Sequence, residues 1–173
     1  MILSMILILD ASSIIAFYSE MHEQQLLHEL TNYGYQLIAP IAVINEISKG
    51  RKPTWSKLKK AIDDGKITTA SGFSSSEISA FKKRYPNLDE GEIQVLILGA
   101  KKKKKGDEYM CVFDEGPARK IASHHQIAKT GTIGLLDVLN DLGIIDEKKK
   151  ESLLNVLNHS KFRIKKSLVS ANR

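Results

Sequence analysis

The feature that most constrains the fold is a short apolar run that ends at an acid. Residues 5–9 read MILIL, without alternation of apolar and polar positions, and Asp10 follows directly. A run of this kind is typical of a strand that is covered on both faces, as in a parallel sheet with helices on each side. The chain is therefore expected to fold around a central buried strand.

Further short apolar runs alternate with longer segments of helical periodicity along the rest of the chain. The expected strands are YQLIAP at 35–40, KITTA at 66–70 and CVF at 111–113. The expected helices cover 11–19, 21–32, 41–52, 74–85, 93–105, 117–125, 131–143 and 147–162. Ser12 or Ser13 is placed to cap the first of them. This alternation predicts an α/β fold with a mostly parallel sheet.

Length and composition favour one globular domain with a nucleic-acid partner. We expect a single domain over residues 1–173, with the helices from about residue 133 packing on it or extending it. The 26 Lys and Arg residues against 20 Asp and Glu residues give a net charge of +6, which favours a polyanion such as RNA. Asp10 interrupts the apolar N-terminus, so we expect no membrane segment and a cytoplasmic protein. Cys111, the only cysteine, lies in an apolar strand and is expected in the core.

Four carboxylates are placed where an α/β sheet binds ligands. Asp10 and Asp114 each follow an expected strand, and the carboxyl ends of parallel strands share one edge of the sheet. Glu46 and Glu92 lie on helices that can point to the same edge. Converging carboxylates repel one another by about 4 kcal/mol per pair at 4 Å and an effective dielectric near 20, which a divalent cation relieves. Oxygen ligands without Cys or His at zinc spacing predict Mg²⁺ or Mn²⁺.

Such a centre is typical of phosphodiester hydrolysis, in which metal ions activate water and stabilise the leaving oxygen. Arg119, one helical turn beyond Asp114, is a candidate for holding a substrate phosphate, with an ordinary exposed helix arginine as the alternative. Thr132 is a candidate for lining the same edge, although Gly-Thr is also common where a loop enters a helix. Lys101–Lys105 end a helix and are a further candidate RNA contact.

Five segments in this order resemble the PIN-domain family of nucleases. They read LILDASSII, APIAVINEI, LDEGEIQVLILGA, FDEGPARKIA and TGTIGLLDVLNDLGII. The likeness is strongest to a toxin-like subgroup whose motifs are L-D-x-G-E and G-T-x-G-L-L. It runs from about Met5 into the closing helices.

The resemblance implies a metal-dependent ribonuclease with a three-layer α/β/α fold and a five-stranded parallel sheet. It also implies a toxin role with an antitoxin partner, and a homodimer. The family's acids match Asp10, Glu46, Glu92 and Asp114, and Ser12 falls where the family places a small polar residue beside the metal. Asp89 is an alternative to Glu92.

Two functional hypotheses remain open from the sequence. The first is a Mg²⁺- or Mn²⁺-dependent endoribonuclease. The second is a catalytically weak module of the same fold that binds RNA or protein, because the subgroup has two aspartates where this chain has Asp114 and Glu115. A phospho-acceptor domain fits poorly, because Leu9 precedes Asp10 where that chemistry needs a second acid, and a dehalogenase-like phosphatase needs an aspartate where Ser12 stands.

Overall fold

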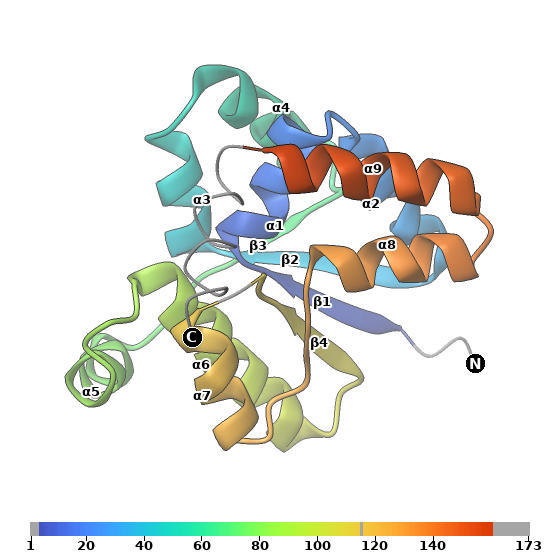
Figure 1. Cartoon of the computed structure of the whole chain (residues 1–173). Coiled ribbons are helices and arrows are strands. Elements are labelled where there is room, and N and C mark those ends of the chain that lie inside the picture. The colour runs from blue at the N-terminus through green and yellow to red at the C-terminus, as the bar shows by residue number, and fades with distance from the viewer. Residues whose placement is uncertain (1–3, 115, 161–173) are drawn as a thin grey trace.

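A five-stranded parallel sheet lies between two groups of helices (Figure 1). The computed structural model describes residues 4–114 and 116–160. The strands are β1 (Met5–Leu9), β2 (Tyr35–Pro40), β3 (Thr68–Ala70), β4 (Tyr109–Val112) and β5 (Lys129–Thr130), in the order β3-β2-β1-β4-β5. Every neighbouring pair is parallel. The expected three-layer α/β fold is confirmed.

Each connection between strands contains helices. β1 leads to β2 through α1 (Ala11–Ile15), the π-helix η1 (Ala16–Glu20), α2 (Gln24–Glu29) and the 3₁₀ helix η2 (Leu30–Tyr33). The later connections contain α3 (Ile41–Ser48) with α4 (Lys52–Asp63), then α5 (Ser75–Arg84) with α6 (Glu90–Lys105), then α7 (Pro117–His124). After β5 come α8 (Thr132–Asp141) and α9 (Glu147–His159). α1, α2, α8 and α9 lie on one side of the sheet and α6 and α7 on the other (Figure 1).

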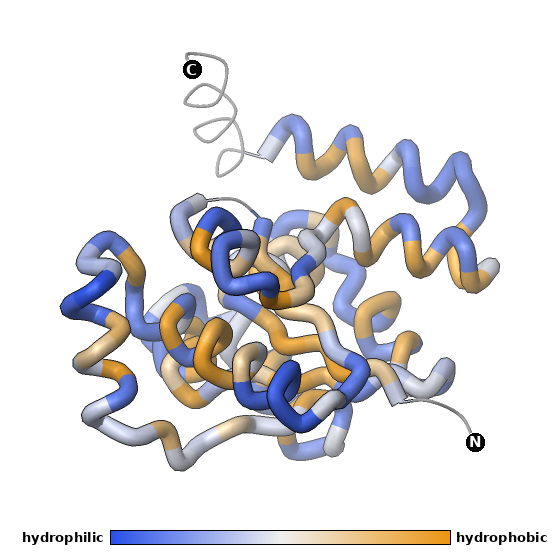
Figure 2. The backbone as a smooth tube through the Cα atoms, turned by 90° about the horizontal axis from the view of Figure 1, so that it is seen from below, coloured by the Kyte–Doolittle hydropathy of each residue, from blue (hydrophilic) through white to orange (hydrophobic). Residues whose placement is uncertain are grey.

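The central strand is buried on both faces, as its composition predicts. Leu7, Ile8 and Leu9 are at most 2% exposed, and the interior strands form a continuous hydrophobic band in Figure 2. Cys111 is fully buried in β4, and its Sγ atom donates a hydrogen bond to the Val95 carbonyl of α6 over 3.6 Å. The cysteine is therefore a core residue, as expected.

Several boundaries differ from the sequence-based expectation. Asp10, not Ser12 or Ser13, is the N-cap residue of α1, and the helix widens to a π-helix at Ala16. The helix expected over 41–52 is two helices separated near Gly50. The two-residue strand β5 is too short to be recognised by its periodicity. The last expected helix ends at His159 in the described part of the chain, and its positions 161–162 lie outside that part.

The strand order places the site. From β1 the chain builds outward through β2 to β3, and it then returns to the other side of β1 to form β4 and β5. The order therefore reverses between β1 and β4, and in open α/β sheets ligands bind outside the carboxyl ends of the strands at this point. Among the described residues, no helix is both long and apolar enough to cross a lipid bilayer.

Candidate metal centre

Asp10 lies at the carboxyl end of β1, directly at the reversal of strand order. Its backbone N–H donates to the Val112 carbonyl of β4 over 3.2 Å, so the first residue after β1 is fixed against the neighbouring strand. The hydroxyl of Ser12 donates to Asp10 Oδ2 over 3.2 Å, and that of Ser13 to the Asp10 carbonyl over 2.9 Å. Asp10 makes no side-chain cap to α1, and Ser12 holds its carboxylate from within the first turn of that helix.

Asp114 follows β4 at the same edge and is held by the start of α8. The Thr132 N–H donates to Asp114 Oδ1 over 2.7 Å, and the Thr132 hydroxyl donates to Oδ2 over 2.9 Å. Thr132 is fully buried, so this two-point contact is shielded from water. A carboxylate at a helix N-terminus is also favoured by the helix dipole.

Arg119 stabilises the segment that carries Asp114. Its Nη1 atom donates to the Phe113 carbonyl over 2.6 Å. A Cβ atom added to Gly131 would lie 3.0 Å from the Phe113 carbonyl oxygen and 3.2 Å from both Arg119 Nη1 and Asp114 Oδ1, so a side chain at this position would force its neighbours to shift. Arg119 is thus beside the site, and part of its guanidinium group is used to hold the backbone of the β4–α7 loop.

Glu46 on α3 approaches the start of α6 at Gly91. A Cβ atom added to Gly91 would lie 3.5 Å from Glu46 Oε2 and 3.3 Å from Asp89 Oδ1. Because Gly91 has no side chain, the carboxylates of Glu46 and Asp89 can lie on either side of it. The two acids are therefore neighbours although 43 positions separate them in the sequence.

Asp89 and Glu92 form a capping box at the N-terminus of α6. The Glu92 N–H donates to Asp89 Oδ1 over 2.8 Å, and the Asp89 N–H donates to Glu92 Oε2 over 3.1 Å. Both carboxylates also raise the pKa of Asp10, Glu92 more strongly than Asp89. Glu92 is thus coupled more closely to Asp10, whereas Asp89 is coupled to Glu46.

These carboxylates influence one another electrostatically. The pKa of Asp10 is raised from 3.8 to about 7, mainly by burial and further by the charges of Glu92, Asp89 and Glu46, against a backbone hydrogen bond from Ala11 that lowers it. Partial burial and then the charge of Asp89 raise the pKa of Glu46. The region concentrates negative charge that a bound cation would offset.

The donor chemistry fits a hard divalent cation. The groups at this edge are carboxylate and hydroxyl oxygens, the ligands that Mg²⁺ and Mn²⁺ prefer. Within residues 4–114 and 116–160, no three Asp, Glu, His or Cys side chains are close enough together to form a complete cage. Mg²⁺ commonly binds through one or two carboxylates and retains several waters, so a complete protein cage is not required.

The lysine run that is a candidate RNA contact lies away from the acids. Lys101–Lys105 are at the C-terminal end of α6, roughly 14–20 Å along the helix axis from Glu92 at about 1.5 Å per residue. Lys101, Lys102 and Lys103 bind Glu77, Asp107 and the His125 carbonyl respectively. Glu115 lies outside the described residues.

Sequence reasoning did not single out Gly91 or Arg51, and it named Gly131 only with Thr132 at the edge of the sheet, not for its lack of a side chain. The two glycines allow backbone to pass close to the acids, a role that only the assembled contacts identify. Arg51 follows the helix of Glu46 in the basic stretch KGRK, residues 49–52, which was a readable signal for an anion-binding turn.

Comparison with protein families gives one match. The family model is described as a PIN domain, and it matches residues 6–172. No curated protein matches the chain.

Proposed function

Because the chain belongs to the PIN-domain family and has its nuclease-type fold, we propose that it is a Mg²⁺- or Mn²⁺-dependent endoribonuclease. The observation that carries the proposal is the placement of Asp10 and Asp114 at the carboxyl ends of adjacent parallel strands, with Glu46, Asp89 and Glu92 nearby. This arrangement lies at the point where the strand order reverses.

Asp10, Glu46, Glu92 and Asp114 are the residues that would hold the metal, with Asp89 as the alternative to Glu92. The cation would supply an activated water and would offset the charge on the phosphate. Ser12 orients the Asp10 carboxylate, and Thr132 orients that of Asp114 through two hydrogen bonds. Arg119 positions the loop through the Phe113 carbonyl, and its remaining N–H groups are available to a substrate phosphate.

RNA is the proposed substrate because the net charge of +6 favours a polyanion. The affinity that the basic residues supply falls steeply as salt concentration rises and carries no sequence choice of its own.

Cleavage of RNA by the purified protein tests the proposal. With Mg²⁺ or Mn²⁺ the wild type should cut RNA, and chelation with EDTA should stop the reaction. Asp10→Asn should lower the rate by at least about a hundredfold, because it removes a charged metal ligand. Asp141→Asn, an exposed position on α8, is the matched control and should cut at the wild-type rate. Cleavage that Asp10→Asn leaves unchanged would refute the assignment.

A non-catalytic binding module is the second candidate, and the capping box favours it. Asp89 and Glu92 already bind the backbone at the start of α6, which limits their freedom to hold a cation. Calorimetric titration with Mn²⁺ separates the two functions. RNA binding without measurable uptake of Mn²⁺ at millimolar concentration would favour the module, whereas saturable uptake favours the nuclease.

We also propose that the protein acts in the cytoplasm as the toxin of a toxin–antitoxin pair and forms a homodimer. Induced expression should then arrest bacterial growth, and Asp10→Asn should relieve the arrest. Sedimentation should give the mass of two chains. Normal growth of cells that express the wild type at the same level as Asp10→Asn would contradict the toxin role.

A further inference from the structure

A pocket lies immediately beside the acidic residues. Its volume is about 510 Å³, within the range of small-ligand sites, and it lies between α1 and η1 on one side and α3 and the start of α4 on the other. Glu46 lines the pocket and is also the neighbour of Asp89 in the candidate metal centre. A molecule in the pocket would therefore be adjacent to the proposed reaction site.

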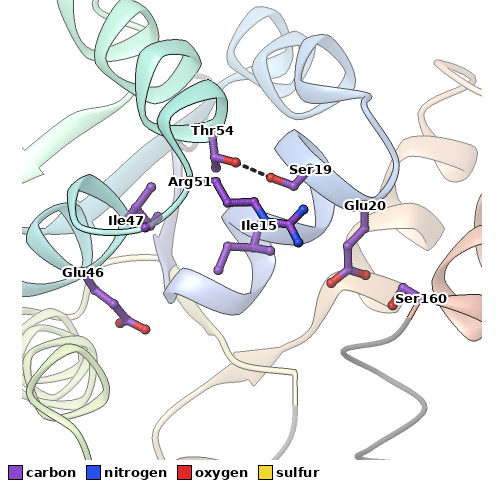
Figure 3. Close-up of a pocket in the computed structure, with 9 residues that line it drawn as sticks. Ile15, Ser19, Glu20, Glu46, Ile47, Arg51, Thr54 and Ser160 are labelled. Carbon is purple, nitrogen blue, oxygen red and sulfur yellow. Dashed lines mark hydrogen bonds between the residues drawn. The ribbon is translucent and has the colours of Figure 1, made fainter.

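The pocket walls combine apolar surface with hydroxyl groups and with the carboxylates of Glu20 and Glu46. Ile15 is half-buried and offers aliphatic surface to the pocket, whereas Ile47 on the opposite helix is 4% exposed and presents little surface. The hydroxyls of Ser19 and Thr54 are hydrogen-bonded to each other at one end, as Figure 3 shows. A flat heterocycle with a polar edge matches such walls better than a sugar or a phosphate does.

Basic residues lie along the α3–α4 side of the pocket. Lys49, Arg51 and Lys52 are all exposed, and the Arg51 guanidinium forms no hydrogen bond or ion pair with the described part of the chain. Arg51 extends from the start of α4 toward α1 and η1 (Figure 3). An arginine without a carboxylate partner is suited to bidentate contact with a phosphate.

We propose that this pocket binds one unpaired nucleotide of the RNA, adjacent to the phosphodiester bond that is cut. The base lies against Ile15, and Arg51 contacts the nucleotide's phosphate. The proposal rests on the proposed nuclease function, and it requires one nucleotide beside the bond that is cut to be unpaired. A base in a duplex cannot enter the pocket without leaving its stack, which costs a few kcal/mol.

Binding in EDTA tests the pocket separately from cleavage. Fluorescence anisotropy would compare a short single-stranded RNA, its duplex, and a series of the same RNA with one abasic nucleotide at each position in turn. We expect the duplex and one abasic position to bind about tenfold more weakly than the intact single strand. Arg51→Ala should weaken binding of all single strands about tenfold and leave the abasic effect in place.

Ile15→Ala should remove most of the difference in affinity between intact and abasic RNA. Arg84→Ala on α5 is the control for Arg51→Ala, because it removes one arginine outside the pocket. The abasic series on the wild type needs no variant, so it decides even if Ile15→Ala folds poorly. Equal binding of all the RNAs would overturn the pocket. Cleavage with Mn²⁺ is measured independently. Cleavage without an abasic effect would refute the pocket proposal alone, and an abasic effect without cleavage would refute the nuclease function alone.

Discussion

At the end of β1, a single aspartate combines burial with three nearby carboxylates. Burial is the main cause of the raised pKa of Asp10, and Glu92, Asp89 and Glu46 add to it. A carboxylate in such surroundings destabilises the metal-free fold when it is charged. The charged form of Asp10 therefore has a cost in stability, as is common for residues at functional sites, and this is consistent with the role proposed for it.

Replacing Asp10 by Asn should stabilise the metal-free protein at high pH. The pKa of Asp10 is about 7 in the folded chain against 3.8 as the ordinary value, so the wild type loses stability as pH rises between these values. Asn cannot ionise. The free energy of unfolding of Asp10→Asn should therefore exceed that of the wild type by about 1–2 kcal/mol at about pH 8, with little difference near pH 4. Urea unfolding in EDTA measures both. A variant less stable than the wild type at the higher pH would contradict the account.

Thr132 should matter through its hydroxyl group. Thr132→Val keeps the size and the backbone N–H but leaves Asp114 Oδ2 without its 2.9 Å hydrogen bond, at an expected cost of about 1–2 kcal/mol. Thr132→Ser retains the hydroxyl and serves as the matched control. Activity should fall in the valine variant and recover in the serine variant. Equal rates in both variants would show that the hydroxyl does not position Asp114.

The sequence predicts which side chains are candidates for the site better than it predicts which groups those side chains contact. Asp10 and Asp114 follow apolar runs, and parallel strands bring such positions to one edge. The choice between Asp89 and Glu92 could not be made, because D-x-x-E is at once a capping box and a pair of candidate ligands. The role of Arg119 at the Phe113 carbonyl depends on the path of a loop, which its sequence does not specify.

At the scale of elements, α6 connects the core to the site. Its first turn carries Asp89 and Glu92, and its middle packs closely on β4. A Cβ atom added to Gly99 would overlap Cys111 Sγ and would lie 3.0 Å from Ile127 Cγ2. Gly99 therefore fixes the distance between the helix and the sheet, and with it the position of the helix start.

Gly99→Ala should destabilise the protein by about 1–3 kcal/mol through overpacking. Cys111→Ala removes the sulfur atom that the new methyl group would meet. The double variant should then be more stable than the sum of the two single effects predicts, by about 1 kcal/mol. Thermal unfolding of the four proteins measures this coupling. Strictly additive effects would show that the added methyl group is hindered by atoms other than Cys111 Sγ.

Elements with strong signals were predicted well, and those set by tertiary contacts were not. β1 and β2 have the bounds that their apolar runs predict. The π-helix η1 and the separation of α3 from α4 near Gly50 depend on packing between helices, which propensity does not report. β5 has two residues and exists because β4 provides its hydrogen bonds.

At the scale of the whole molecule, the strand order determines where charge of each sign gathers. The reversal between β1 and β4 brings acids from β1, α3, α6 and β4 to one edge of the sheet. The lysines of α6 lie at the opposite end of that helix from Glu92, whereas Arg51 lines the same pocket as Glu46. Arg51 is close to Glu46 in the sequence and stays close to it in the fold, whereas the direction of α6 carries its lysines away from Glu92.

Binding of Mn²⁺, followed by electron paramagnetic resonance, tests the central claim most directly. The wild type and Asp141→Asn should bind Mn²⁺ with the same affinity, and Asp10→Asn and Asp114→Asn should each bind it at least about tenfold more weakly. This result is expected if the acids at the carboxyl edge of β1 and β4 share one cation. Equal Mn²⁺ affinity in all four proteins would contradict it.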